Sequence, residues 1–169
     1  ETIRQTISKY QSPPLGDGGK EQLFVIKIGG NVIDNDESLQ SFLQSFASIK
    51  SPKILVHGGG KIATKIGDKL GVKSKYIDGR RITDDDTIDI LTMVYGGLVN
   101  KKMISQLQAK GSNAIGLTGA DANLIPATKR GTKALSFGEG LGEVIDYGWV
   151  GDIENSKIKI GTIKLFLEN

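Results

Sequence analysis

The chain has 169 residues, a length that favours a single domain with a sizeable core. Its net charge of +3 comes from 22 basic and 19 acidic residues, a mixture too balanced to indicate nucleic-acid binding. It has no cysteine, which excludes disulfides, thiolate metal sites and cysteine catalysis and is typical of a cytoplasmic protein.

The sequence predicts neither export nor membrane insertion. No apolar run approaches the roughly 20 residues that span a bilayer, and the first residues are polar, unlike a signal peptide. Residues 12–19 (SPPLGDGG) have the composition of a turn or linker. We therefore expect residues 1–22 to be a tail or linker and residues 23–169 to form one folded lobe.

Residues 23–31 (LFVIKIGGN) combine a short apolar run with two glycines. A β-branched run that stops at Gly29 and Gly30 predicts a buried parallel strand leading into a tight loop. Lys27 is unusual in such a strand because an ammonium group is costly to bury unless an anion meets it. Glycine loops also let backbone N–H groups approach a ligand. Together these features indicate a site for a phosphate-sized anion at the strand's carboxyl end.

The next elements repeat this arrangement. Acidic and amide residues at 35–37 suit a helix start, and the apolar residues after them have helical spacing. Residues 53–57 (KILVH) predict a second strand that also ends in glycines, followed by a helix that closes at Gly71. The order β-α-β-α predicts an α/β fold with a parallel sheet and ligands at the carboxyl ends of its strands.

A long helix is expected over residues 83–110. Thr83 and Asp86 have the spacing of a capping box at its start. Gly96 and Gly97 lie in its middle, where each glycine costs about 1 kcal/mol relative to alanine. Two explanations stay open: another element, including another subunit, approaches the backbone there, or the glycines separate two shorter helices.

Beyond this helix the pattern changes to short extended segments. Residues 114–117 (AIGL) predict a third short strand. Three further candidates are separated by glycine and lysine and predict a β-hairpin excursion at the edge of the sheet: residues 124–128, 134–137 and 143–145. Residues 160–167 predict a final amphipathic helix.

The glycines after the second strand fit one nucleotide-binding pattern. The P-loop pattern fails because Leu55 and Ile62 occupy positions that need Gly and Ser or Thr. The dinucleotide pattern G-x-G-x-x-[GA] matches residues 58–63 (GGGKIA), with Asp78 near the distance of a ribose-binding acid. An NAD-dependent oxidoreductase is therefore one alternative. Residues 79–81 look like a loop, which counts against a Rossmann strand ending there.

Six motifs occur in the order found in N-acetylglutamate kinases, which the chain resembles. They are residues 24–31 (FVIKIGGN), 56–61 (VHGGGK), 79–84 (GRRITD), 97–101 (GLVNK), 116–125 (GLTGADANLI) and 148–153 (GWVGDI). The resemblance implies the amino-acid kinase superfamily and an incomplete three-layer α/β/α sandwich. It also implies phosphoryl transfer from ATP to the side-chain carboxylate of an N-acylated glutamate, as in arginine biosynthesis.

On the nucleotide side, the resemblance assigns Lys27 to the catalytic lysine that stabilises the transferring phosphoryl group. Gly29 and Gly30 match the loop over the phosphates. This agrees with the chemistry, because a transferring phosphoryl group spreads negative charge over its oxygens and is stabilised by placement and positive charge. ATP is expected with Mg²⁺ carried mainly by its phosphates, and no dedicated protein metal site is predicted.

On the acceptor side, Gly59 and Gly60 match glycines that bind the acyl-glutamate through backbone N–H groups. Arg81 matches the arginine that binds its α-carboxylate, a task that suits a guanidinium fork. Acetyl is the usual acyl group of the family, and a longer one such as succinyl stays open.

The resemblance stops where the chain stops. Relatives continue with a second half that supplies most of the ATP site, so this chain alone is expected to bind the acid weakly and to have low activity. Members are usually homodimers through a long helix, which would be residues 83–110 here. A non-catalytic ligand-binding or regulatory module on the same fold is the main alternative.

Overall fold

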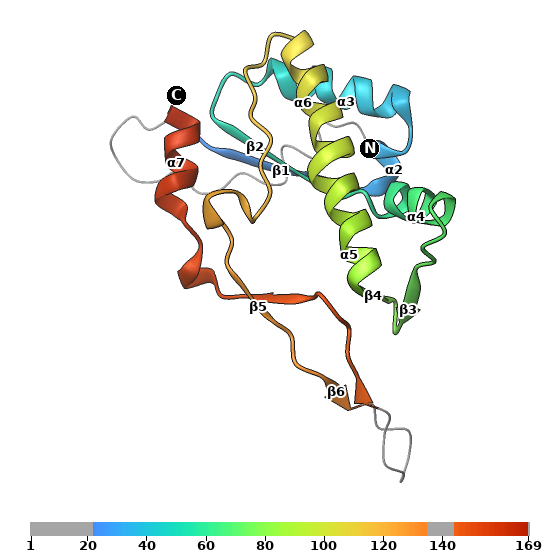
Figure 1. The fold of residues 1–169 in the computed structure, drawn as a ribbon. Coiled ribbons are helices and arrows are strands. Elements are labelled where there is room, and N and C mark those ends of the chain that lie inside the picture. Colours follow the sequence, from blue (N-terminus) through green and yellow to red (C-terminus); the bar gives the residue numbers. More distant parts are fainter. Residues whose placement is uncertain (1–21, 135–143, 169) are drawn as a thin grey trace.

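The computed structural model describes residues 22–134 and 144–168. The predicted tail therefore lies outside the described residues except for Gln22, as does most of the predicted strand at 134–137. Figure 1 shows the elements, which are β1 (Phe24–Ile28), α2 (Gly30–Ile33), α3 (Asp36–Ser48), β2 (Lys53–His57), α4 (Gly60–Lys69), β3 (Lys75–Ile77), β4 (Arg80–Ile82), α5 (Asp85–Leu91), η1 (Thr92–Val99), α6 (Asn100–Ala109), η2 (Asp121–Asn123), β5 (Ala127–Lys129), β6 (Lys133–Ala134), β7 (Val144–Ile145), β8 (Gly151–Ile153), η3 (Asn155–Lys157) and α7 (Ile160–Glu168).

Strands β1 and β2 pair in parallel, as the sequence predicts, and the α/β fold class is confirmed. Ile28 lies beside His57, so both strands end at the same edge of the sheet. The pair is covered mainly on one face. Ile28 is buried, whereas Val25 and Val56 on the other face are 57% and 43% exposed. The expectation of a fully buried β1 is therefore wrong, because no described element covers that second face.

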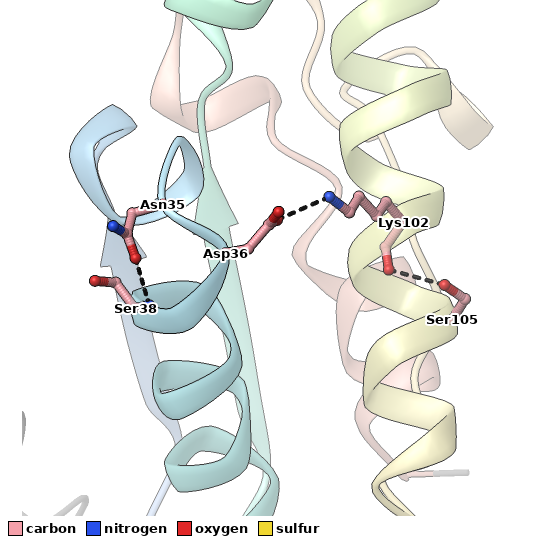
Figure 2. A network of polar contacts seen from close by, with 5 residues as sticks. All are labelled: Asn35, Asp36, Ser38, Lys102 and Ser105. Atoms are coloured by element: carbon pink, nitrogen blue, oxygen red, sulfur yellow. Dashed lines mark hydrogen bonds and ion pairs between the residues drawn. The ribbon is translucent and has the colours of Figure 1, made fainter.

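Helix α3 begins as predicted after Asn35, whose side-chain oxygen accepts a hydrogen bond of 2.8 Å from the N–H of Ser38. Figure 2 shows this cap beside the ion pair that joins α3 to α6, in which the Lys102 ammonium lies 3.1 Å from the Asp36 carboxylate. Apolar residues of α3 then enter the core at helical spacing: Leu39, Phe42, Leu43 and Phe46.

The core lies between these helices and the strand pair. It joins β1 and α3 to α4 and to the long helix of α5, η1 and α6. Its other buried members are Ile28, Ile33, Ala63, Ile90, Val94, Val99, Met103 and Leu107. Helix α4 ends where expected, because Gly71 adopts a φ of 83° after the cap. Among the helices that the structure describes, none is long and apolar enough to cross a membrane.

The long helix is continuous, but its middle is a π-helix. Asp84, rather than Thr83, is the N-cap, and its carboxylate accepts from the N–H of Thr87 at 3.0 Å. The two glycines lie within η1, so they do not separate two helices. A methyl group on Gly96 would lie 3.1 Å from the Thr118 methyl carbon, which confirms close approach at this glycine by another part of the same chain.

Residues 114–117 are not a strand, contrary to the sequence prediction. Side chains of α6, and not a neighbouring strand, donate to carbonyl groups of this segment. Gln108 donates to the Ala114 carbonyl at 3.1 Å, and Lys101 donates to the Gly116 carbonyl at 2.9 Å. The predicted third strand therefore fails because its backbone acceptors are already occupied by the preceding helix.

The predicted β-hairpin excursion is confirmed as an arm that extends from the body in Figure 1, but its expected place at the edge of the parallel sheet is wrong. Strand β5 pairs antiparallel with β8, and β6 pairs antiparallel with β7, in two small sheets that do not include β1 or β2. Helix α7 follows as predicted. Backbone hydrogen bonds fix the arm just before the long helix. The Thr83 N–H donates to the Tyr147 carbonyl, and the Thr83 carbonyl accepts from the backbone N–H of Trp149.

A second hairpin, β3 to β4, was not predicted, because residues 79–81 were expected to be a loop. Its turn residues are Asp78 and Gly79, with φ angles of 50° and 72°. An Asp-Gly pair with two positive φ angles is a preferred two-residue hairpin turn. The Asp-Gly pair is thus a local signal for this hairpin, whose strands are only three residues long.

Candidate functional site

The two glycine loops lie together at the carboxyl edge of the strand pair, as the sequence predicts for a ligand site. Gly29 and Gly30 follow β1, and Gly59 and Gly60 follow β2. One side chain connects helices α2 and α4, which follow these loops. The Lys61 ammonium lies 2.8 Å from the amide oxygen of Asn31. The parallel register of β1 and β2 thus places both expected binding loops side by side.

The second loop rests on Tyr95. A methyl group on Gly59 would lie 3.0 Å from Cδ1 of the Tyr95 ring, and one on Gly60 would lie 3.6 Å from its hydroxyl oxygen. Tyr95 belongs to η1, so the π-helical segment supports the predicted substrate-binding loop. Single π-helical turns inside α-helices often occur at functional sites because they change which side chains face a neighbour. The sequence alone assigns no role to Tyr95.

Arg81 reaches this loop from β4. Its guanidinium donates to the Gly60 carbonyl at 3.3 Å and to the Thr64 hydroxyl at 3.0 Å. It also donates to the Ser74 hydroxyl at 2.6 Å and lies over the Tyr76 ring, 5.2 Å from its centroid. All these partners are neutral. The structure therefore brings Arg81 to Gly60, and among the described residues no carboxylate forms a hydrogen bond or ion pair with its guanidinium.

Lys27 lies on β1, two residues before Gly29, and its side chain is exposed. Within residues 22–134 and 144–168, no hydrogen bond or ion pair of its ammonium group is found. The strand alternation directs Lys27 to the same exposed face as Val25, away from buried Ile28. Lys27 is thus next to the first glycine loop in the chain but is not fixed to it by a polar contact.

His57 connects the second loop to the long helix. Its Nδ1 lies 2.9 Å from the Gly58 carbonyl, and its Nε2 lies 3.3 Å from the amide nitrogen of buried Asn100. Nδ1 donates to the carbonyl oxygen, and Nε2 accepts from the amide of Asn100. His57 is therefore a hydrogen-bonded packing residue that holds the start of the glycine loop.

An apolar cleft of about 500 Å³ lies beside the open edge of β2. It runs from His57 and Tyr95 past α6 to the last helix, where Ile163 and Phe166 line it. Figure 1 shows α7 apart from α5 and α6, with the 112–126 segment between them. The glycine loops and Arg81 do not line this cleft. His57 and Tyr95, which contact the second glycine loop, also line the cleft.

Two other sequence features have structural explanations. Asp78 occupies the β3–β4 turn and not the end of a parallel strand, so the dinucleotide pattern lacks its ribose-binding acid. Asp121 accepts from the Thr118 backbone, which lowers the pKa of its carboxyl group, so it stabilises a turn. In the part of the chain that the structure describes, no three His, Cys, Asp or Glu side chains gather into a possible metal site.

Comparison with known proteins gives curated relatives named acetylglutamate kinase. The protein from Cytophaga hutchinsonii is 54% identical over 134 residues, which are 79% of this chain and 47% of the relative. The protein from Bacteroides fragilis is 51% identical over 135 residues, 80% of this chain and 48% of the relative. The chain therefore spans about half the length of these relatives.

Solved structures agree on the fold. A crystal structure of a Streptococcus mutans protein matches with a TM-score of 0.64 and 26% identity, over 87% of this chain and 55% of that one. N-acetylglutamate synthase from Neisseria gonorrhoeae, in complex with coenzyme A and L-arginine, matches with a TM-score of 0.54 and 16% identity, over 86% and 33%. The model of the amino acid kinase family matches residues 22–169. The chain belongs to the amino acid kinase family.

Proposed function

We propose that this chain is the acyl-amino-acid half of a kinase that phosphorylates the side-chain carboxylate of N-acetyl-L-glutamate or another N-acylglutamate, in arginine biosynthesis. The observation that carries the proposal is the position of Arg81, whose guanidinium bonds, among the described residues, to the Gly60 carbonyl and to two hydroxyl groups, all of them neutral. An unbalanced guanidinium beside N–H donors suits a carboxylate ligand. The names of the relatives supply the reaction.

In the proposed reaction, a side-chain carboxylate oxygen of the acceptor attacks the γ-phosphorus of ATP. The bond from that phosphorus to the β–γ bridging oxygen breaks, ADP leaves, and an acyl phosphate forms. The N–H groups of Gly59 and Gly60 would hold the acceptor, and Arg81 would bind its α-carboxylate. Lys27 would face the charge on the transferring oxygens, where a cation lowers the barrier.

The nucleotide would be bound only in part by this chain. Gly29 and Gly30 follow β1 without side chains that would block an approaching phosphate, and a methyl group on Gly29 would meet nothing within 4 Å. Mg²⁺ would be held mainly by the ATP phosphates. Because the chain spans about half of its curated relatives, we place most of the adenosine-binding surface outside it.

Isothermal titration of the chain with N-acetyl-L-glutamate tests the acceptor site. We expect weak binding that Arg81→Ala reduces at least tenfold, since a hydrogen bond to a charged group contributes about 1.5–3 kcal/mol. Arg80→Ala is the matched control, because Arg80 is the exposed neighbour on the same strand. Equal affinity of Arg81→Ala and the parent chain would contradict the assignment of Arg81.

An ATP-dependent hydroxamate assay tests the catalytic proposal. We expect little turnover from the 169-residue chain alone. In a protein of its relatives' length that includes this chain, Lys27→Ala should lower kcat far more than it changes the KM of the acyl-glutamate. Retained binding without phosphorylation of any N-acylglutamate by that longer protein would favour the non-catalytic ligand-binding module.

We also propose that two copies associate through the long helix. Met93 and Leu98 on η1 are 54% and 50% exposed, so both offer apolar surface to a second copy. Light scattering should give twice the chain mass, and Leu98→Lys should give the monomer. A cytoplasmic location stays a prediction.

A further inference from the structure

We propose that Thr64 is a positioning residue for Arg81: its hydroxyl, together with that of Ser74, holds the guanidinium ready for the α-carboxylate of the acceptor. This inference rests on the proposed function, because it concerns the same carboxylate. Neither Thr64 nor Ser74 belongs to the motifs that indicated the family, and neither was predicted as a site residue.

The donors of Arg81 are divided between fixed contacts and free positions. A guanidinium has five N–H groups. Nη1 uses one on the Ser74 hydroxyl at 2.6 Å, and Nη2 uses its two on the Thr64 hydroxyl at 3.0 Å and the Gly60 carbonyl at 3.3 Å. Among the described residues, neither the Nε–H nor the second Nη1–H has a hydrogen-bond partner, so either of them is left for a carboxylate oxygen. The contacts that hold the group are therefore separate from those that would bind the acid.

Thr64 connects the three parts of the site through one hydroxyl. It donates to the Gly60 carbonyl at 3.0 Å, and it accepts from Arg81. The Tyr76 hydroxyl lies 3.4 Å away and is the donor in that contact, since the proton of Thr64 is already used. The first turn of α4, the glycine loop and the β3–β4 hairpin thus meet at this oxygen.

Positioning matters here because of the element that carries Arg81. Strands β3 and β4 are three residues each and pair only with one another. Two-stranded hairpins of this kind are marginally stable by themselves. A free arginine side chain also loses rotamer entropy when it is fixed. Contacts made before the ligand arrives reduce that loss on binding.

Two variants separate this role from simple packing. Thr64→Val keeps the shape of the side chain and removes the hydroxyl, whereas Thr64→Ser keeps the hydroxyl. We expect Thr64→Val to weaken binding of N-acetyl-L-glutamate about fivefold, the equivalent of one ordinary hydrogen bond. Thr64→Ser should stay within about twofold. Both should keep a cooperative thermal transition.

The matched ligand is the α-carboxamide of N-acetylglutamate, which lacks the charge that Arg81 would bind. Its affinity should be the same for the parent chain and for Thr64→Val. A ligand-free measurement completes the test: the ¹⁵N order parameter of the Arg81 Nε–H should fall in Thr64→Val, with Arg80 as the reference. Unchanged order of Arg81 in Thr64→Val would overturn the inference.

The outcomes distinguish the inference from the proposed function. Parent-like affinity of Thr64→Val for the acid, with Arg81→Ala impaired, would overturn the positioning role and leave the function in place. An equal loss for the acid and the carboxamide would also overturn it, because the effect would not involve the carboxylate. If the parent chain does not bind the acid, the proposed acceptor site fails, and the order parameter still decides whether Thr64 holds Arg81.

Discussion

Gly59 and Tyr95 are in contact across the site, so that a methyl group at position 59 would lie 3.0 Å from one ring carbon and 3.1 Å from the next. That spacing is tighter than most Cβ contacts. The second glycine loop and the π-helical segment are therefore fitted to one another, and a side chain at position 59 would separate them.

The first prediction concerns this contact. Gly59→Ala should lower the free energy of unfolding by about 1–3 kcal/mol, the range for overpacking. Gly60→Ala should cost less, because its methyl group would be at an ordinary distance of 3.6 Å. Chemical denaturation measures both. Tyr95→Leu should recover part of the loss when combined with Gly59→Ala, and strict additivity of the two changes would contradict the proposed contact.

Gly116 provides a second, stronger test of packing. A methyl group there would overlap the side-chain oxygen of Asn100 and lie 2.8 Å from Cγ1 of Ile104. We expect Gly116→Ala to destabilise the fold by about 2–3 kcal/mol. Gly97→Ala is the matched control, because its methyl group would meet nothing within 4 Å and alanine favours helices. A thermal midpoint for Gly116→Ala equal to that of Gly97→Ala would show that residues 114–117 do not pack as described.

The attachment of the arm can be followed by fluorescence. Trp149 is the only tryptophan, and its indole N–H donates to the Asp85 carboxylate at 2.6 Å. Asp85→Ala should shift the emission to longer wavelength and lower stability by less than about 1 kcal/mol, because the pair is exposed. Asp86→Ala, one residue along the same helix, should leave the emission unchanged. A blue shift in Asp85→Ala would contradict this arrangement.

A larger effect is expected at Gly148, where the backbone of the arm meets Thr83. Its φ is 76°, and a methyl group would overlap the Thr83 carbonyl. Gly148→Ala should break the bridge between the arm and the long helix and increase amide hydrogen exchange at Trp149, which donates to that carbonyl. Exchange protection equal to that of the parent chain would contradict this prediction.

The cap of the long helix predicts how stability changes with pH. Hydrogen bonds from the Thr87 side chain and backbone lower the pKa of Asp84 below its usual value of 3.8. A lowered carboxyl pKa adds stability above the unfolded-state pKa, and this contribution is lost as the pH falls below about 4 through the folded value. Asp84→Asn should keep the cap but flatten this dependence, whereas Asp84→Ala should cost about 1 kcal/mol even at pH 7. An unchanged acid transition in Asp84→Asn would contradict the assignment.

Local sequence signals were sufficient for most of the elements. The caps at Asn35 and Gly71 and the strand at 53–57 could be predicted because each depends on residues next to one another in the chain. The absence of a strand at 114–117 could not be predicted, because side chains of α6 bind the carbonyl groups of this segment, and no local sequence pattern shows such contacts. The β3–β4 hairpin was missed although Asp78 and Gly79 signalled its turn.

For the site, the sequence identified the loops but not what supports them. The positions of Gly59, Gly60 and Arg81 followed from motifs, and the structure brings them together. Tyr95 contacts the second glycine loop from the π-helical segment, and Thr64 contacts Arg81 where α4 meets the β3–β4 hairpin. Both are tertiary contacts. The assignment of Lys27 to the transferring phosphoryl group stays a prediction.

The π-helical segment has a consequence for variation in chain length. A wide turn of this kind absorbs an additional residue within an otherwise regular helix. Loss of one amino acid between 92 and 99 would let the helix close into regular α geometry while α5 and α6 kept their inward faces. Tyr95 and Gly96 would then withdraw from Gly59 and Thr118. Insertions and deletions at this point would therefore alter ligand recognition among homologues while sparing their architecture.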